Sequence, residues 1–388
     1  MSFAIHGLGT ANPPDAVSSA DGLRLARKLA GSDVRTSTWL VPVYEKSGVE
    51  RRYQVIGGAV VRDVLDGEDR VSSPFYPTPA RDNVGPTTAE RMTMYAAEAG
   101  PLALRAAAQA VAESGFAPES FTHLVTVSCT GFGAPGVDLA LIRGLGLRPT
   151  VERTHVGFMG CHGALNGLRV ANAFAAANPG ARVLVAAVEL CSLHYYYGNE
   201  ADKLIANAIF ADGAAAIAGQ ASGPRERAVS EPFDVAQEQP AHAGRSPGSW
   251  SLRASGSCLI PESTADMAWT VGDNGFAMTL SRRVPNLIAG HLRPWLEGWL
   301  RDNGLSLADV RSWAVHPGGP KILVAVEEAL GLPPASLAAS RAVFADRGNM
   351  SSPTVLFVLD KLRREGAPGP CVALGFGPGL VAEAALFA

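Results

Sequence analysis

A single cysteine in a glycine-rich stretch is the first feature with the chemistry of a nucleophile. Cys161 lies in GFMGCHGALNGL, residues 157–168, where four glycines leave little side-chain bulk around it. Glycines permit a tight turn and the close approach of another molecule. A helical pattern over residues 162–177 follows, and the positive end of a helix dipole lowers a thiol pKa. We therefore predict that Cys161 is a reactive nucleophile, with a nearby backbone N–H as an oxyanion donor.

Two further polar residues stand where functional side chains are common. His316 ends the apolar segment SWAVH and precedes the loop PGGP, residues 317–320. Loops that follow strands often carry binding and catalytic groups. An imidazole beside a thiolate would stabilise it and donate a hydrogen bond to a substrate carbonyl. Asn349 follows Gly348 at the start of another helical pattern, where it is either a helix cap or a side chain that enters the same pocket.

An internal repeat relates the segments that carry these residues. The stretch ESGFAPESFTHLVTVSC, residues 113–129, is similar in order to DNGLSLADVRSWAVHPGG, residues 302–319. Cys161 lies 46 residues after the Gly of the first copy, and Asn349 lies 45 residues after that of the second. Such a repeat predicts two similar halves. If they pack with pseudo-twofold symmetry, Cys161, His316 and Asn349 meet in one pocket.

The composition narrows the class of protein. The chain has 388 residues, of which 47% are apolar and 18% charged, so we expect a large buried core. A net charge of −3 without a basic block argues against a nucleic-acid partner. No apolar run is long enough to cross a membrane and no signal peptide is evident. The five scattered cysteines fit reduced thiols, without metal-site spacing, in a cytoplasmic enzyme.

Strand and helix patterns alternate along the chain, which predicts a layered α/β fold. We place one half at residues 1–225, with Cys161, and the other at residues 226–388, with His316 and Asn349. Residues 222–265 read as a loop-rich connection. The clearest predicted elements are strands at 123–129, 182–190, 312–316 and 371–376 and helices at 162–177 and 321–330.

Four separated segments resemble one known family. GFMGCHGALNGLRVA, VHPGGPKIL, GNMSSPTVLFVLD and GFGPGLVAE are similar to signature segments of the chalcone synthase family, the type III polyketide synthases. The resemblance covers about residues 3–388. It implies the thiolase fold, a duplicated five-layered α/β/α/β/α body, and a homodimer. It also implies CoA thioesters as substrates, with no metal or organic cofactor.

The resemblance also implies an acyltransferase mechanism. Cys161 would carry an acyl starter delivered as its CoA thioester. His316 and Asn349 would bind the thioester carbonyl of malonyl-CoA, promote the loss of CO₂ and stabilise the enolate. This enolate would attack the acyl group on Cys161, and repetition followed by cyclisation would give a pyrone, a resorcinol or a small aromatic polyketide.

The same resemblance implies which residues line the substrate pocket. Phe210 matches an aromatic gatekeeper, and Met278 replaces a second gatekeeper phenylalanine. Lys46 is the one basic residue retained at the CoA entrance, while Arg51, Arg52 and Arg282 are either further CoA contacts or solvated surface charges. The remaining implied positions are Cys129, Thr130, Ala134, Cys191, His194, Ser351, Gly375 and Pro378.

Other functions stay open at this point. An initiating β-ketoacyl-ACP synthase would share the fold and the Cys-His-Asn set, and a hydroxymethylglutaryl-CoA synthase would need a glutamate base that we do not place. A thiolase-fold partner subunit without activity is the alternative from a different class. Within the main interpretation, both long acyl starters and self-priming by malonyl-CoA are open, since residue identities do not give the cavity volume.

Overall fold

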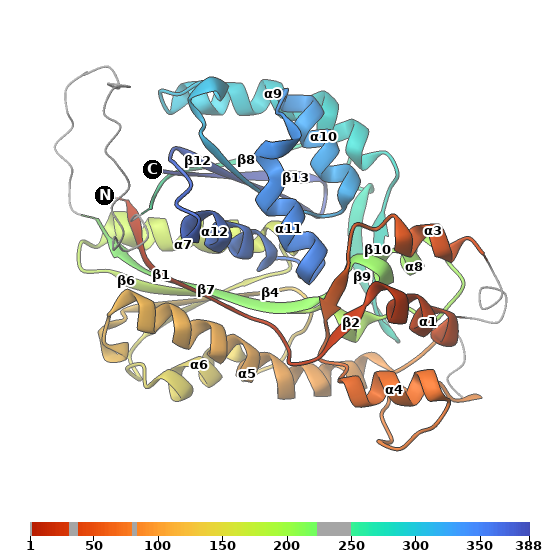
Figure 1. Ribbon diagram of the computed structural model, residues 1–388. Coiled ribbons are helices and arrows are strands. Elements are labelled where there is room, and N and C mark those ends of the chain that lie inside the picture. The colour runs from red at the N-terminus through yellow and green to blue at the C-terminus, as the bar shows by residue number, and fades with distance from the viewer. Residues whose placement is uncertain (1, 31–37, 80–83, 223–249) are drawn as a thin grey trace.

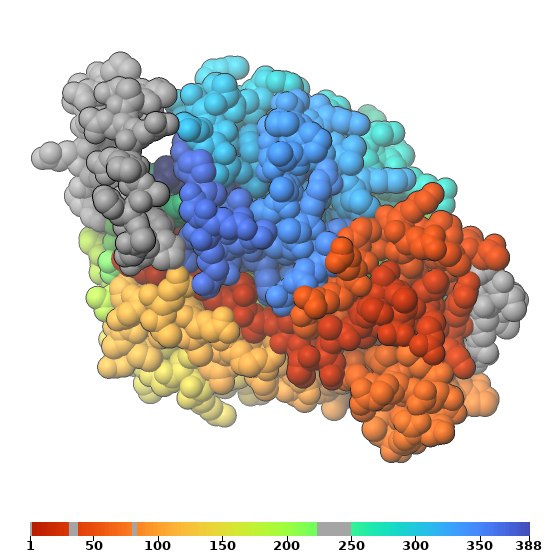
Figure 2. Space-filling view, in the orientation of Figure 1, coloured from red at the N-terminus to blue at the C-terminus, as the bar shows by residue number. Residues whose placement is uncertain are grey.

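The computed structural model describes residues 2–30, 38–79, 84–222 and 250–388. Helices and sheets alternate in five layers, with a pair of helices in the middle and one layer of helices on each outer side (Figure 1). Figure 2 shows that the two ends of the sequence, in red and in blue, pack directly against each other. The predicted five-layered α/β architecture is confirmed.

The first half of the chain forms five neighbouring strands in the order β5-β4-β6-β7-β1. Strand β4 pairs in parallel with both β5 and β6, whereas β6–β7 and β7–β1 are antiparallel. Their bounds are β1 Phe3–Ala11, β4 His123–Ser128, β5 Glu152–Gly157, β6 Arg182–Leu190 and β7 Asp212–Ala221.

The second half repeats this topology with four strands in the order β11-β12-β13-β8. Strands β11 and β12 are parallel, and β12–β13 and β13–β8 are antiparallel, as in their counterparts β4, β6, β7 and β1. The halves join where β1 pairs with β8 at two positions, which makes one sheet of nine strands. The bounds are β8 Ser251–Leu259, β11 Ser312–Val315, β12 Cys371–Gly377 and β13 Val381–Phe387.

Six helices form the three helical layers. Helices α7 (Gly163–Ala177) and α12 (Thr354–Arg364) lie in the middle and share one apolar cluster with residues of both sets of strands. Helices α5 (Thr88–Ser114) and α6 (Val137–Leu145) cover the first half, and α9 (Val284–Asp302) and α10 (Pro320–Leu330) cover the second. Helix α5 starts at a capping box formed by Thr87 and Glu90 and ends before Gly115, which has a left-handed backbone.

Helix α11 (Ala338–Arg347) packs against α12 and adds Ala339 and Val343 to the middle apolar cluster. The other elements gather beside the open end of these layers. The hairpin of β9 and β10 packs near α8, and α1 packs against α3, α4 and α8. Their bounds are β2 Ala16–Ser18, α1 Ser19–Leu29, α3 Leu40–Glu45, β3 Arg51–Tyr53, α4 Gly58–Asp66, α8 Ala201–Ile209, β9 Met267–Gly272 and β10 Gly275–Leu280.

Two details differ from the sequence predictions. The expected connection at residues 222–265 contains strand β8, which the sequence analysis did not predict because its sequence mixes polar and apolar residues. Residues 223–249, which include the predicted boundary at 225/226, lie outside the described part of the chain. Asn349 does not open a helix directly, because α12 begins five residues later, at Thr354. The predicted strands at 123–129, 182–190, 312–316 and 371–376 and both helices are confirmed to within one residue at either end.

Close packing of α5 on β1 gives the first testable prediction. A Cβ on Gly9 would collide with the Ala106 carbonyl and lie 2.7 Å from the Ala110 nitrogen, both main-chain atoms that cannot move aside. We expect Gly9→Ala to lower the free energy of unfolding by about 1–3 kcal/mol. Gly298→Ala is the control, since a Cβ there would have no atom of the described residues within 4 Å outside its own turn of α9, and alanine favours the helix by up to about 1 kcal/mol. Urea unfolding measures both, and equal stabilities of the two variants would contradict this packing.

Candidate active site

Cys161 lies in a tight turn between β5 and α7. The turn Gly160–His162 is a short 3₁₀ helix that leads directly into α7. Gly160 has a φ of +65°, and a Cβ there would collide with the ring of Pro378. The turn therefore requires a glycine at this position, and the GFGPG segment, residues 375–379, packs directly behind the cysteine.

His316 follows β11 and is almost completely buried, with 1% of its surface exposed. Its backbone nitrogen donates to the Leu374 carbonyl (2.8 Å), which fixes it beside the end of β12. Neither ring nitrogen has a hydrogen-bond partner among the described residues. A buried imidazole in this state has hydrogen-bonding capacity left for a ligand.

Asn349 is held by main-chain hydrogen bonds to the segment around Phe210. Its nitrogen donates to Ile209 O and its carbonyl accepts from Ala211 N, each at 2.8 Å. The side-chain oxygen accepts from Ser351 N (2.8 Å). The side-chain amino group makes a long contact of 3.4 Å with Gly318 O, and a minor hydrogen-bonding interaction of Asn349 with Cys161 acts to lower the pKa of that thiol. Its donors are therefore weakly engaged.

The structure brings these three side chains into one cavity of about 380 Å³. Cys161 comes from the first half of the chain, whereas His316 and Asn349 come from the second. The cavity is otherwise largely apolar; its lining also includes Phe210, Met267, Met278, Leu280, Gly318, Ile322 and Phe376. The convergence that the repeat predicted is therefore present, and the roles of the three residues stay predictions.

Burial controls the charges of this site. It raises the pKa of Cys161 to about 11, with a smaller contribution from the nearby Glu189 carboxyl, and it lowers the pKa of His316 to about 3. The prediction of a lowered thiol pKa is wrong, because desolvation outweighs the effect of the helix start. Thiol and imidazole are both neutral near pH 7.

Glu189 is a buried acid beneath the pocket that the sequence analysis missed. Its carboxylate accepts hydrogen bonds from Cys129 N (3.0 Å), Thr130 Oγ1 (2.7 Å) and Ser352 Oγ (2.7 Å). Burial raises its pKa, and these hydrogen bonds act in the opposite direction. The one signal was an acidic residue near the end of the otherwise apolar strand RVLVAAVEL, residues 182–190.

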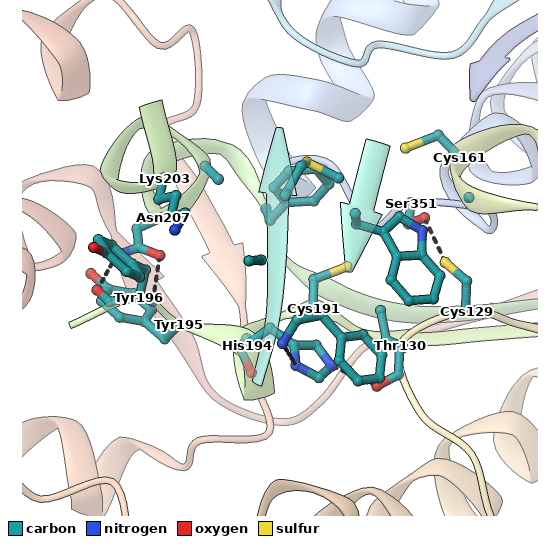
Figure 3. Close-up of a pocket in the computed structure, with 18 of the residues that line it drawn as sticks. Cys129, Thr130, Cys161, Cys191, His194, Tyr195, Tyr196, Lys203, Asn207 and Ser351 are labelled. Carbon is teal, nitrogen blue, oxygen red and sulfur yellow. Dashed lines mark hydrogen bonds between the residues drawn. The ribbon is translucent and has the colours of Figure 1, made fainter. Parts of the chain in front are cut away.

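A larger cavity of about 970 Å³, which includes its open mouth, starts at the same cysteine. Lys203, Asn207 and Tyr196 lie toward one end, and Cys161, Ser351 and Cys129 toward the other (Figure 3). The sequence-predicted residues that line it are Cys129, Thr130, Cys161, Cys191, His194, Phe210, Met278, Ser351 and Pro378.

Three predicted pocket residues line neither cavity among the described residues. Ala134 is exposed, and Lys46 is exposed at the end of α3. Gly375 instead makes room for His162, because a Cβ added at Gly375 would lie 3.1 Å from the Cβ of His162. Of the other CoA candidates, Arg52 is buried, while Arg51 is exposed and pairs with Asp346.

The β9–β10 hairpin supplies pocket residues that the sequence analysis did not name. Trp269 pairs across the hairpin with Met278, and Met267 pairs with Leu280, so these side chains share a face. The signal was the alternating pattern in MAWTVG and GFAMTL, residues 267–272 and 275–280. The additional lining residues are Gln54, Gly160, Ser192, Tyr195, Tyr196, Lys203, Ala206, Asn207, Met267, Ala268, Trp269, Phe276 and Ala277.

No group of three or more His, Cys, Asp or Glu side chains among the described residues is arranged to hold a metal ion. No helix within the described part of the chain is long and apolar enough to span a membrane.

Family models match both halves of the chain. The N-terminal domain of chalcone and stilbene synthases matches residues 4–223, and the C-terminal domain matches residues 251–388. The chain thus belongs to the chalcone and stilbene synthase family. It is a type III polyketide synthase, an acyltransferase that extends an acyl group by repeated condensation with malonyl-CoA.

Individual relatives agree with this assignment. The chain is 31% identical to the "Alpha-pyrone synthesis polyketide synthase-like Pks18" of Mycobacterium tuberculosis, over 99% of this chain and 90% of that protein. It is 34% identical to the bisdemethoxycurcumin synthase of Oryza sativa subsp. japonica, over 99% and 91%.

Solved structures show the same fold. PKS-I from the brown alga Ectocarpus siliculosus superposes with a TM-score of 0.86 at 31% identity, covering 100% of this chain and 98% of that one. The C-terminal type III polyketide synthase domain of Steely1 from Dictyostelium gives 0.82 at 25% identity, covering 100% and 99%. The thiolase fold implied by the sequence is therefore confirmed.

The raised thiol pKa predicts how Cys161 reacts in the absence of substrate. Only the thiolate is alkylated, and a pKa of about 11 keeps its population small near pH 7. We expect the rate of Cys161 alkylation by iodoacetamide to rise about tenfold per pH unit from pH 7 to 10. Mass spectrometry of peptides separates this site from the half-buried Cys258. A rate that levels off below pH 8 would show a thiolate already formed in the empty site.

Proposed function

We propose that Cys161 is the acyl carrier and that His316 and Asn349 bind the thioester carbonyl of malonyl-CoA. The observation that carries this proposal is the set of available or weakly engaged donors in one largely apolar cavity. Neither nitrogen of His316 has a partner among the described residues, and the Asn349 amino group is only weakly bonded. Cys161 lines the same cavity. Donors preorganised in a low-dielectric site stabilise a developing oxyanion strongly.

The loading step transfers the starter acyl group from CoA to Cys161. The thiol proton passes to His316 as the sulfur attacks the thioester carbonyl, and the imidazolium then protonates the departing CoA thiolate. Because the thiol and the imidazole are both neutral near pH 7, this step forms the two charges together and removes them together. A neutral His316 is regenerated for the next step.

Extension begins when the malonyl carboxylate leaves as CO₂. The electron pair of the broken C–C bond forms an enolate, whose oxygen accepts hydrogen bonds from His316 and Asn349. The enolate carbon attacks the acyl group on Cys161, a new C–C bond forms, and the cysteine thiolate leaves. The product is a CoA thioester two carbons longer, which reloads onto Cys161. The carbanion comes from decarboxylation, so this scheme needs no metal or organic cofactor.

We propose a cyclised polyketide of the pyrone type as the product. The support is the similarity over almost the whole chain to a relative whose printed name refers to α-pyrone synthesis. Phe210 and Met278 line both cavities, as a gate between them would. The substrates of the proposed reaction are malonyl-CoA and an acyl-CoA starter. The alternative is that an acyl carrier protein delivers the starter, and a comparison of the activity with acyl-CoA and with acyl-carrier-protein substrates would distinguish the two.

We also propose that the chain forms a homodimer through strand β5. This strand is at the edge of the sheet, where unpaired N–H and C=O groups favour a partner. Large apolar side chains gather close by, with Phe132 48%, Phe158 54% and Met159 44% exposed. An apolar patch of this kind beside an edge strand suits a second copy of the chain.

The division of roles predicts that substitutions of the three residues affect decarboxylation and condensation differently. His316→Ala and Asn349→Ala each remove a donor to the enolate, and we expect CO₂ release from malonyl-CoA to fall by about 10²–10³-fold. Cys161→Ala removes the acyl carrier alone, so CO₂ release continues while no extended product forms. Labelled malonyl-CoA with a starter acyl-CoA measures both steps.

The matched control is Cys258→Ala, a thiol outside both cavities. It retains both activities. Equal loss of CO₂ release in Cys161→Ala and His316→Ala would contradict the separation of roles, and activity with carrier-protein substrates alone would favour an initiating ketoacyl synthase.

The dimer proposal makes a prediction about mass in solution. Phe158 has a φ of +62°, a conformation that aspartate tolerates, so Phe158→Asp adds a charge to the patch without backbone strain. We expect the wild type to have twice the chain mass of 40.3 kDa by light scattering and Phe158→Asp to have one chain mass. Val324→Asp, exposed on α10, is the control and stays dimeric. A monomeric wild type would refute the dimer.

A further inference from the structure

The residue after the nucleophile is a buried histidine that the proposed mechanism does not use. His162 has 3% of its surface exposed and lies in the turn that carries Cys161. Two glycines of β12 make room for it: a Cβ at Gly377 would collide with its ring, and one at Gly375 would lie 3.1 Å from its Cβ. A second imidazole is therefore enclosed next to the nucleophile.

Hydrogen bonds connect this imidazole to a carboxylate from the other half of the chain. Asn166 Nδ2 donates to Glu383 Oε1 (3.2 Å), so the side-chain oxygen of Asn166 faces His162 and accepts from its Nδ1 (2.8 Å). Nδ1 thus carries the ring hydrogen. The other nitrogen, Nε2, is buried without a hydrogen-bond partner among the described residues, so no acceptor is in place for a second proton on the ring.

An arginine that reaches the surface balances this carboxylate. Glu383, on β13, is almost completely buried, and its Oε2 accepts from Arg169, whose side chain is 41% exposed. Asn166 and Arg169 follow His162 by four and seven residues, so the three side chains lie on one face at the start of α7. The polar chain of His162, Asn166, Glu383 and Arg169 therefore leads from the active-site turn to the surface.

The charges of this polar chain act on His162 in opposite directions. Burial lowers the pKa of His162, the bond to Asn166 and the Glu383 carboxylate act to raise it, and Arg169 acts to lower it. Burial also lowers the pKa of His316 to about 3, and positive charge on His162 adds to this decrease. The groups whose charges interact with His162 are thus Glu383 from β13, Arg169 from α7 and His316 at the end of β11. Each imidazole opposes a proton on the other.

We propose that His162 is a positioning residue that acts through His316: while neutral, it leaves His316 able to accept the Cys161 proton during loading, and Arg169 keeps it neutral by balancing Glu383. The inference rests on the proposed function and adds a residue to its loading step. When His162 takes up a proton in acid, its charge opposes the imidazolium that His316 must become, and loading slows. Loss of Arg169 brings this slowing to higher pH, and loss of the Glu383 charge moves it to lower pH.

The test follows the acylation of Cys161 by hexanoyl-CoA, without malonyl-CoA, by rapid acid quench and mass spectrometry of the intact protein. For each variant the rate at pH 5 is divided by its own rate at pH 7.5, so a general loss of activity cancels. We expect the wild type to slow only below about pH 6.5, the usual pKa of histidine. Arg169→Gln lowers the ratio at least twofold, Glu383→Gln raises it at least 1.5-fold, and Arg169→Lys, which keeps the charge, retains the wild-type ratio.

A variant without the second imidazole identifies the cause. His162→Phe keeps a flat ring that cannot take up a proton, so adding Arg169→Gln to it leaves the ratio unchanged. If His162→Phe does not fold, the opposite shifts in Arg169→Gln and Glu383→Gln decide. Arg293→Gln is the matched control, since Arg293 on α9 is also ion-paired, is 46% exposed and lies outside both cavities; it keeps the wild-type ratio.

Three results would overturn the proposal while leaving the proposed function intact. They are an unchanged ratio in Arg169→Gln, a shift of Arg169→Gln and Glu383→Gln in the same direction, and a shift by Arg169→Gln that persists in the His162→Phe background. Each would show that the charge of His162 does not act on loading. A wild type that is not acylated at Cys161 at any pH would instead refute the proposed function, and this inference with it.

Discussion

The packing of α7 and α12 between the two sets of strands is the constraint on which the site depends. Apolar side chains of both helices belong to one buried cluster, so the halves cannot separate without exposing it. Gly163, the first residue of α7, lies so close to the other half that its Cβ would be 3.4 Å from that of Ser352. This contact is what allows residues from distant parts of the chain to share one cavity.

The same burial decides the electrostatics. A thiol and an imidazole that are removed from water both favour their neutral forms, so Cys161 and His316 do not form an ion pair near pH 7. A neutral imidazole is still a hydrogen-bond donor, and an enolate oxygen needs donors more than it needs a full positive charge nearby. Burial thus makes the resting thiol less reactive and, at the same time, makes each donor more effective once a substrate enters.

The sequence predicted what depends on local pattern and on order along the chain. Buried strands such as residues 182–190 have uninterrupted apolar character, and the repeat correctly linked Cys161 with Asn349. Packing and solvation could not be predicted from the sequence. Nothing in the spacing revealed that desolvation would raise the pKa of Cys161, that Gly375 accommodates His162, or that Trp269 turns toward the pocket. Each of these depends on residues that are distant in the chain.

In the proposed function, donors from the second half of the chain converge on a thioester next to Cys161. A crystal structure with a malonyl-CoA analogue that cannot lose CO₂ tests it most directly. We expect the thioester oxygen within about 3.2 Å of both His316 Nε2 and Asn349 Nδ2, with the reacting carbon within about 4 Å of Cys161 Sγ. An analogue bound with its carbonyl turned away from these two donors would contradict it.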